Sequence, residues 1–326
     1  MSARRSFLSI SAPLVLAIAV FTAYSSHSSN MRLQALKAKN ANAFFPGQTV
    51  LLVGATSGIG EAMARRLAQA KFNVVVAGRS VERGNAVVAA LAAAHPDGAH
   101  RFVPLDAQYV RNIRGLSHEV PQIDKLVFTQ GIATIQGRTP TSEGIDQKMA
   151  LHYYGRMALI QEFLPLLRES RQSPRVLSVF SAGVHKSYDG LRDDPEMTSS
   201  YTLQNAANAA GFYNDLMLDA WSVDPANAAI AFGHAAPGIV ATNWGTEMPW
   251  VIRALLKPLK AVFAKSANES AEFMCDFLLD PAVAPGQLHL IDQYGQPAAR
   301  TELHTDAARD FIRQHTEALL DRVATP

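Results

Sequence analysis

The sequence contains one cysteine, Cys275, and no HExxH or similar helix-spaced pair among its ten histidines. A single cysteine excludes an intramolecular disulfide and a cysteine-rich zinc site. Scattered histidines predict no metal site. Charged residues make up 18% of the chain, below the roughly 25% of an average globular protein. The formal net charge of +2 argues against a nucleic-acid partner.

Acidic residues are missing from the start of the chain, where the first one is Glu61. Two arginines precede a largely apolar stretch over residues 7–24, which is near the lower limit of about 17 residues for a membrane span. We therefore expect residues 1–30 to be a signal peptide or a signal anchor, and the protein to be membrane-associated in the endoplasmic reticulum or secretory route. The alternatives are a mitochondrial transit peptide and a cytoplasmic enzyme that begins near Met31.

Strand and helix signals alternate from Gln48 to Asp292. The runs Thr49–Val53 and Asn73–Ala77 are continuously apolar, which is typical of parallel strands buried on both faces. The alternation predicts one α/β domain with a doubly wound parallel sheet. We assign residues 31–292 to this domain and residues 293–326 to a C-terminal tail with one helix.

The spacing of apolar residues also predicts where the individual elements lie. The strands expected after the first two are Arg101–Leu105, Lys125–Thr129, Arg175–Phe180, Ala228–Gly233 and Gln287–Ile291. The expected helices are Glu61–Ala70, Val81–Ala94, Gln108–Glu119, Asp146–Glu169, Tyr201–Trp221, Asn268–Leu279 and Asp306–Val323.

A glycine-rich turn connects the first strand to the first helix. Glycines at such a turn let the backbone approach a pyrophosphate, and the helix N-terminus offers N–H groups to the phosphates. The strand before the turn and the helix after it are the context that this interpretation needs. We therefore predict dinucleotide binding by Gly54, Thr56, Ser57, Gly58, Ile59 and Gly60.

The second strand ends in Arg79. An acidic residue at this place would bind the ribose hydroxyls of NAD, whereas an arginine suits the 2′-phosphate of NADP. We therefore expect NADP as the cofactor rather than NAD.

The spacing Gly-x-x-x-Gly-x-Gly resembles that of the short-chain dehydrogenase/reductase family, and Ala206-Ala207-Asn208 resembles the Leu-Ala-Asn of its retinol-dehydrogenase-like members. The resemblance implies a Rossmann fold and hydride transfer with a nicotinamide cofactor. The further cofactor contacts that it implies are Asp106, Gly131, Pro237, Gly238 and Thr242. Two asparagines usual in the family before the glycine at 131 are absent.

The resemblance also implies a catalytic set. Ser181, at the end of a strand, would hold the carbonyl oxygen, and Tyr201, at the start of a helix, would donate the proton. The family places a lysine four residues after the tyrosine and an asparagine on the preceding helix. Here Asn205 replaces the lysine and His152 stands at the asparagine position.

Loss of the lysine matters because its charge lowers the pKa of the tyrosine. Two charges about 4 Å apart at an effective dielectric of 20 interact by ~4 kcal/mol, or roughly three pKa units. The side chain of Asn205 can hydrogen-bond to a ribose hydroxyl, but it supplies no charge. We expect weakened turnover, with His185 or Lys186 as substitutes for the missing cation.

Residues 244–265 follow the last implied cofactor contact, at the place of the family's substrate lid. They combine two tryptophans with apolar and basic residues, a composition that suits a lid resting on a membrane surface. The alternative is a lid helix packed on the domain. Either interpretation favours a bulky apolar substrate.

We therefore expect an NADP-dependent oxidoreductase that acts on a hydrophobic carbonyl or alcohol. The alternative is a dinucleotide-binding protein with little catalysis, a sensor or scaffold, which Asn205 supports; a membrane-associated assembly factor is a weaker third. The expected partners are a small hydrophobic substrate, a membrane contacted through residues 7–24 and 244–265, and a second copy of the chain.

Overall fold

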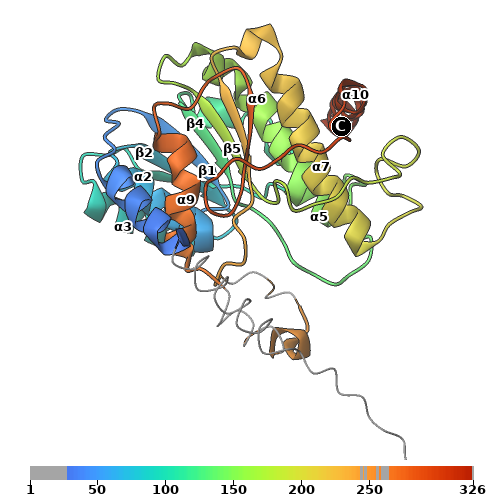
Figure 1. Ribbon diagram of the computed structural model, residues 1–326, viewed down its shortest axis with the longest axis horizontal. Coiled ribbons are helices and arrows are strands. Elements are labelled where there is room, and N and C mark those ends of the chain that lie inside the picture. The colour runs from blue at the N-terminus through green and yellow to red at the C-terminus, as the bar shows by residue number, and fades with distance from the viewer. Residues whose placement is uncertain (1–27, 243–244, 246–247, 255–256, 258–263, 325–326) are drawn as a thin grey trace, which may run out of the picture.

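The computed structural model describes residues 28–242, 245, 248–254, 257 and 264–324. Seven strands form one parallel sheet in the order β3-β2-β1-β4-β5-β6-β7 (Figure 1). The strands are β1 (Thr49–Val53), β2 (Asn73–Gly78), β3 (Arg101–Pro104), β4 (Lys125–Phe128), β5 (Arg175–Val179), β6 (Ala231–Ala235) and β7 (Leu288–Ile291). The predicted single α/β domain with a doubly wound sheet is confirmed.

Helices cover both faces of the sheet (Figure 1). On one face lie α2 (Gly58–Gln69), α3 (Val81–Ala94) and α9 (Ala267–Leu279). On the other lie α4 (Leu116–Glu119), α6 (Gly155–Glu169), α7 (Leu203–Ser222) and α10 (Asp306–Ala324). The shorter elements are α5 (Gln147–Met149), the 3-10 turns η1 (Val110–Asn112) and η3 (Pro225–Asn227), and the π-helical turn η2 (Ala150–Tyr154).

The core is divided into two layers by the sheet, because successive side chains of a strand point to opposite faces. In β1, Leu51 and Val53 belong to the layer under α6 and α7, whereas Val50 and Leu52 belong to the layer under α2 and α9. All four are at most 1% exposed. Burial of each such side chain contributes about 1.5–3 kcal/mol, which explains why continuously apolar runs form the central strands.

Segments before and after the alternating region also contribute to these layers. A helix over residues 28–41 packs on α9 through buried Leu33 and Leu36. At the other end of the chain, α10 packs on α7 with Ile312 and Leu319 buried, and the Thr316 hydroxyl hydrogen-bonds to Tyr153. The tail that follows the last strand thus forms part of the core.

Two expected elements differ from those observed. The helix expected at 108–119 is divided into η1 and α4, because Gly115 adopts a φ of +76° between them. The strand expected at 228–233 begins only at Ala231, since η3 and the buried amide of Asn227, which donates to the Trp221 carbonyl, occupy the preceding residues. The sheet therefore includes His234, a polar residue within an otherwise apolar strand.

Two proposed membrane contacts lie partly or wholly outside the described residues. Residues 7–24 are not described, nor are 244, 246–247, 255–256 and 258–263 of the expected lid. In the described part of the lid, residues 250–254 are helical and the Trp250 side chain is 77% exposed. None of the described helices is both long enough and apolar enough to cross a membrane.

Candidate active site

A cavity opens at the carboxyl ends of β1, β2 and β4, where the strand order changes direction. This is the place where open α/β sheets bind their ligands. It contains ten of the predicted cofactor residues, Gly54, Thr56, Ser57, Gly58, Ile59, Gly60, Arg79, Asp106, Gly131 and Thr242. Asn205, Pro237 and Gly238 do not line it.

Close backbone packing explains why glycines form the turn. A Cβ atom on Gly60 would lie 2.3 Å from the Thr129 hydroxyl oxygen, and one on Gly54 would lie 2.4 Å from the backbone nitrogen of Gln130. Gly54 and Gly58 also have φ values of +85° and +63°, which favour glycine. The turn therefore lets α2 begin directly at the cavity.

The N-terminus of α2 suits a phosphate. The first N–H groups of a helix lack partners within the helix, and Ser57, its N-cap, makes no side-chain hydrogen bond to them. Gly58, Ile59 and Gly60 line the cavity, so this helix end faces it. A bound pyrophosphate would satisfy these donors.

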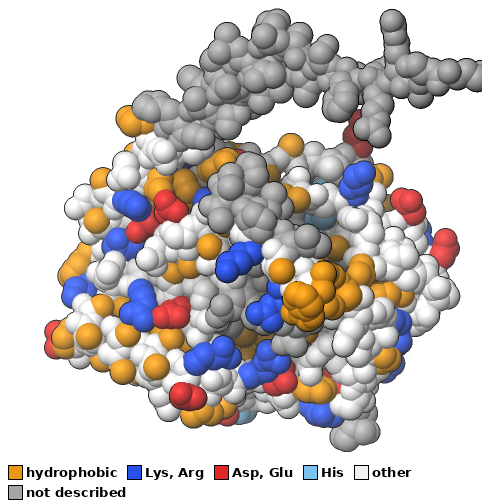
Figure 2. Space-filling view, turned by 90° about the horizontal axis from the view of Figure 1, so that it is seen from below, with side chains coloured by type: hydrophobic (Ala, Val, Ile, Leu, Met, Phe, Trp, Pro, Cys, Tyr) orange, Lys and Arg blue, Asp and Glu red, His pale blue; other side chains and the backbone are white. Residues whose placement is uncertain are grey.

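Two arginines add positive charge to the same cavity. Arg79 follows β2 and Arg83 lies in the first turn of α3; both line the cavity and are exposed. Within the described part of the chain neither forms an ion pair. Figure 2 shows Lys and Arg side chains gathered near the centre of the face seen from below. Arg83 was not predicted, although its place four residues after Arg79 on a helix was visible in the sequence.

The side chain of Gln130 leaves polar atoms for a ligand. Gln130 is 9% exposed and lines the cavity, yet neither its amide oxygen nor its amide nitrogen has a partner among the described residues. Buried polar atoms are normally hydrogen-bonded. An orphaned amide beside the helix end and the arginines fits a bound dinucleotide.

His152 lies next to the cavity and supports its wall. Its Nε2 accepts a hydrogen bond of 3.0 Å from the Ile132 N–H, and its ring packs on Phe180 at 4.7 Å between centroids. Burial, reinforced by the charges of Arg156 and Lys148, lowers the pKa of His152 to about 3. The imidazole is therefore neutral, and it fixes the backbone that follows Gly131.

Tyr201 lies just before the start of α7, away from Ser181, which packs on the middle of that helix. Its hydroxyl is 3.4 Å from Oδ1 of Asp146, and Lys148 Nζ is 5.4 Å from its ring centroid. Burial and the carboxylate of Asp146 hold the pKa of Tyr201 well above its usual value. No hydrogen bond joins Tyr201 to Ser181 in the part of the chain that the structure describes. Its role as the acid stays a prediction from the resemblance.

Asn205 is used within the start of its own helix. Its side-chain Nδ2 donates to the Ser200 carbonyl at 2.8 Å, and its N–H donates to the Thr202 hydroxyl at 2.9 Å. Thr202 caps α7, so the helix begins after Tyr201 rather than at it. The amide nitrogen expected to reach a ribose therefore holds a loop in this structure.

Ser181 follows β5 and packs on the middle of α7. Its N–H donates to His234 Nε2 at 3.0 Å, and a Cβ on Gly211 would come within 2.4 Å of its hydroxyl oxygen. With a rise of 1.5 Å per residue, Gly211 is about 12 Å along the helix from Leu203. Ser181 is thus separated from the start of α7, and it lies between the segments after β4 and β6 that line the cavity.

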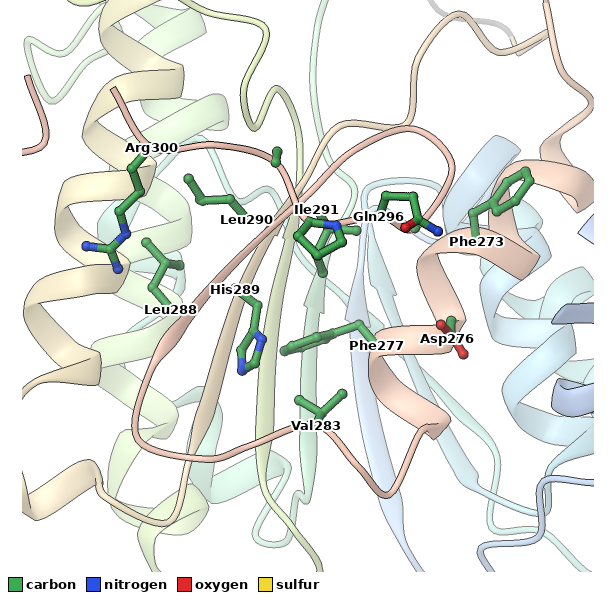
Figure 3. Close-up of a pocket in the computed structure, with 13 residues that line it drawn as sticks. Phe273, Asp276, Phe277, Val283, Leu288, His289, Leu290, Ile291, Gln296 and Arg300 are labelled. Atoms are coloured by element: carbon green, nitrogen blue, oxygen red, sulfur yellow. The ribbon is translucent and has the colours of Figure 1, made fainter. Parts of the chain in front are cut away.

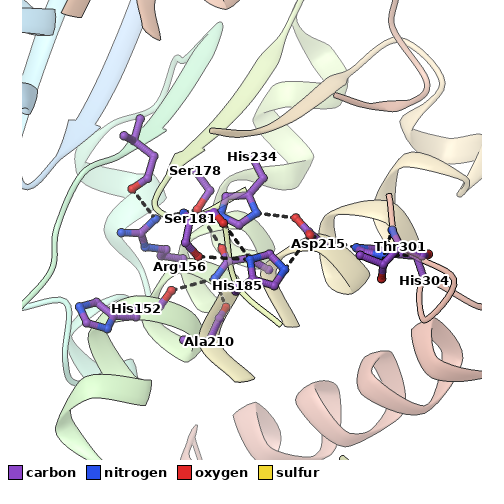
Figure 4. Close-up of polar contacts among 12 residues, drawn as sticks. His152, Arg156, Ser178, Ser181, His185, Ala210, Asp215, His234, Thr301 and His304 are labelled. Carbon is purple, nitrogen blue, oxygen red and sulfur yellow. Dashed lines mark hydrogen bonds and ion pairs between the residues drawn. The ribbon is translucent and has the colours of Figure 1, made fainter. Parts of the chain in front are cut away.

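A cluster of three histidines around one aspartate lies on one side of Ser181 (Figure 4). Asp215 of α7 is 1% exposed, and its carboxylate contacts His234 at 2.5 Å, His185 at 3.0 Å and His304 at 3.0 Å. Burial alone would raise the pKa of Asp215, but these imidazoles hold it well below its usual range. Of these four residues only His185 was predicted from the sequence, because the four come from separate elements.

Arg156 adds a buried cation beside this cluster (Figure 4). It is 1% exposed, its guanidinium lies 5.2 Å from the Phe180 ring centroid, and it donates to the Ser178 hydroxyl and to the carbonyls of Val179 and Gln130. Burial lowers the pKa of Arg156 to about 9. The guanidinium fixes the ends of β4 and β5 on either side of the cavity.

A second cavity lies at the edge strand β7, against α9 (Figure 3). Phe277 from α9 lies against His289 from β7, with 5.5 Å between the ring centroids, whereas Leu288 and Leu290 belong to the layer on the opposite face of the sheet. It contains none of the predicted site residues.

Comparison with known proteins identifies the family. The sequence profile of short chain dehydrogenases matches residues 48–193. The chain is 34% identical over 252 residues to oxidoreductase AN1596 of Emericella nidulans, with 74% of each chain covered. The chain therefore belongs to the short chain dehydrogenase family and is an oxidoreductase of that family.

More distant proteins agree with this assignment. Polyprenol dehydrogenase of Mus musculus is 28% identical over 233 residues, which cover 69% of this chain and 70% of that one. A solved short chain dehydrogenase from Shigella flexneri, complexed with NADP, superposes with a TM-score of 0.55 at 17% identity over 77% of this chain and 98% of that one. The second likeness shows the shared fold.

Proposed function

We propose that the protein transfers hydride between NADP(H) and a bulky hydrophobic carbonyl or alcohol. The observation that carries the choice of cofactor is the pair Arg79 and Arg83 on the cavity wall, without an acidic partner among the described residues. Arginines at this wall suit a 2′-phosphate, whereas NAD calls for a carboxylate. The NADP bound by the Shigella flexneri structure supports the same choice.

Each part of the cavity has a place in this proposal. The N–H groups at Gly58–Gly60 hold the pyrophosphate, the two arginines hold the 2′-phosphate, and Asp106 contacts the adenosine half. Thr242, which lines the cavity beside Gly58, holds the nicotinamide amide. The cofactor supplies the hydride when bound; the chain orients it, excludes water and provides the proton.

The substrate class rests on two observations. The described lid residues expose Trp250 at 77% and Val251 at 48%, which is apolar surface in the segment that follows Thr242 of the cavity. Polyprenol dehydrogenase takes its name from a long apolar alcohol, and a related preference fits this lid. Oxidation of NADPH across a series of apolar aldehydes and ketones of increasing chain length measures it.

The test of cofactor choice is a pair of charge reversals. Arg79→Asp and Arg83→Asp should weaken NADPH binding at least tenfold and leave NADH binding within about threefold, because only NADPH carries the extra phosphate. Arg171→Asp, at an exposed arginine away from the cavity, is the matched control and should change neither. A wild-type preference for NADH in the same fluorescence titration would contradict the proposal.

The sensor or scaffold alternative predicts tight NADPH binding without turnover, and the oxidoreductase names of the relatives argue against it.

We further propose membrane attachment through residues 7–24, outside the described residues. The full chain should sediment with membranes, and a chain starting at Met31 should not; equal sedimentation would contradict the proposal. A homodimer stays a prediction, which analytical ultracentrifugation measures.

A further inference from the structure

The hydrogen bonds around Asp215 determine which histidine carries a charge. The Ser181 N–H donates to His234 Nε2, so that nitrogen has a lone pair and the ring proton is on Nδ1, which donates to Asp215. The Thr301 N–H donates to His304 Nδ1 at 2.9 Å, so the proton of that ring is on Nε2, which also donates to Asp215. Both rings are therefore neutral.

The shortest contact of each His185 ring nitrogen is with an acceptor, while the Ser181 hydroxyl, which can donate or accept, lies further away, 3.4 Å from Nδ1. Nδ1 lies 2.8 Å from the Ser181 carbonyl oxygen, and Nε2 lies 3.0 Å from Oδ2 of Asp215. A carbonyl oxygen and a carboxylate can only accept, so both ring nitrogens of His185 must carry hydrogen. His185 is an imidazolium paired with the Asp215 carboxylate.

The same hydrogen bonds argue against two other uses of these residues. His185, Asp215 and His304 have the separations of a metal-binding group, but the lone pair of His304 Nδ1 already accepts from Thr301, so its Nε2 bears hydrogen and cannot bind a metal. A serine nucleophile would need a base, and His185 has no lone pair to take the Ser181 proton. The arrangement instead stores a proton.

The stored proton lies beside Ser181. His185 Nδ1 is 3.4 Å from the Ser181 hydroxyl oxygen, at the edge of hydrogen-bond distance. Ser181 follows β5, between Gly131 after β4 and Thr242 after β6, and both of these line the cavity. By contrast, the Tyr201 hydroxyl contacts the carboxylate of Asp146, and the residue four positions after it is the uncharged Asn205.

We propose, on the basis of the proposed function, that His185 supplies the proton for carbonyl reduction and passes it to the substrate oxygen through the Ser181 hydroxyl. The carbonyl carbon gains a C–H bond as hydride arrives from the nicotinamide cofactor, and the electron pair of the C=O π bond moves to oxygen. That oxygen takes the Ser181 hydroxyl proton, and Ser181 takes the Nδ1 proton of His185. Water then reprotonates the neutral imidazole, so one carbonyl is reduced for each NADPH oxidised.

Ser181 is the catalytic residue in this scheme, and His185 is a positioning residue that holds its proton. The charged and titratable groups facing His185 are Asp215 from α7, His234 from β6 and, through the shared carboxylate, His304 from the segment before α10. Arg156 of α6 lies further away, behind Phe180. The reduction rate should therefore fall as rising pH removes the imidazolium proton.

The kinetic test compares two histidines that share one carboxylate oxygen. His185→Gln should lower kcat for ketone reduction by roughly 100-fold, the usual contribution of a general acid, and abolish the fall of kcat with pH. Its Kd for NADPH should stay within twofold. His304→Gln, the matched control, should keep the pH profile because its ring holds no extra proton.

A second measurement does not depend on turnover. In the cofactor-free chain, nitrogen NMR of labelled histidine should show both nitrogens of His185 protonated at neutral pH in the wild type, and a neutral ring in Asp215→Asn. The His185→Gln and His304→Gln spectra assign the signals and show whether each variant is folded.

The outcomes separate this inference from the proposed function. A neutral His185 in the wild-type spectrum overturns the inference whatever the activity. Unchanged kcat in His185→Gln overturns it while the wild type still reduces ketones with NADPH. A wild type that oxidises no NADPH with any ketone overturns the proposed function and this role with it.

Discussion

A Cβ atom on Gly211 would lie 2.4 Å from the hydroxyl oxygen of Ser181 and 2.5 Å from the ring of His185. Real Cβ atoms do not approach other atoms so closely, so the helix can face the serine only where it has no side chain. The position of the serine is therefore set by α7 as much as by β5.

We expect Gly211→Ala to reverse the usual effect of this substitution in a helix. Alanine normally stabilises a helix interior relative to glycine by about 0.5–1 kcal/mol, but here overpacking should cost about 1–3 kcal/mol and displace Ser181. Urea unfolding and NADPH oxidation measure the two effects. Ala207→Ser, at an exposed position of the same helix, should change neither; a stabilised, fully active Gly211→Ala would show that the serine does not depend on this contact.

Asp215→Asn should destabilise the fold, because it removes the buried carboxylate that pairs with His185 and accepts from His234 and His304. Breaking a buried ion pair costs about 3–5 kcal/mol. The folded-state pKa of Asp215 is depressed, so its stabilising contribution is present above the unfolded pKa of about 3.9 and is lost as the pH falls further. Unfolding free energies from pH 7 to pH 3 should show this loss in the wild type and a smaller one in Asp215→Asn; parallel curves would contradict it.

Gly54→Ala and Gly47→Ala separate backbone strain from steric exclusion. Both glycines have similar positive φ values, +85° and +79°, but a Cβ on Gly47 meets nothing within 4 Å. Gly47→Ala should therefore cost about 1 kcal/mol of stability and leave NADPH binding unchanged. Gly54→Ala should cost more and weaken NADPH binding at least tenfold, as measured by urea unfolding and fluorescence titration. Equal effects in the two variants would remove the packing argument.

The buried Lys125 should make the free energy of unfolding increase with pH. It is 1% exposed and its Nζ donates to the carbonyls of Gln172 and Ser173, and burial lowers its pKa to about 7. The unfolded chain, with a lysine pKa of about 10.4, binds more protons between these values, so the free energy of unfolding increases from pH 7 to about 10. Lys125→Met should reduce that increase in urea titrations, whereas Lys71→Met, at a half-buried lysine, should preserve it.

The fold and the cofactor cavity could be predicted because their signals are local. Apolar runs such as Thr49–Val53 specify buried parallel strands, and the glycine turn occupies seven consecutive residues, so its geometry follows from spacing alone. Six of the ten predicted cofactor residues that line the cavity lie in this turn, whereas Asp106, Gly131 and Thr242 were implied by the family resemblance. Arg83 was not predicted, because a charged residue in the first turn of a helix is common and does not by itself indicate a ligand.

The reacting end could not be predicted because it depends on long-range packing. The start of α7 is set by the cap at Thr202. The length of the loop from Ser181 to Tyr201 does not determine where the tyrosine lies along this helix relative to Ser181. The partners of Asp215 come from the loop after β5, from β6 and from the segment before α10. No periodicity connects residues so far apart, and only the folded sheet shows that they meet.

The contact between His304 and Asp215 ties the last segment of the chain to the centre of the molecule. A protease that removed everything after β7 would leave the strands and the glycine turn in place, yet it would withdraw one of the donors that hold Asp215 ionised and expose the face of α7 that α10 covers. Related chains that end at the seventh strand must stabilise a carboxylate at this position by other means or lack it, so the length of the chain and the residue at position 215 should vary together.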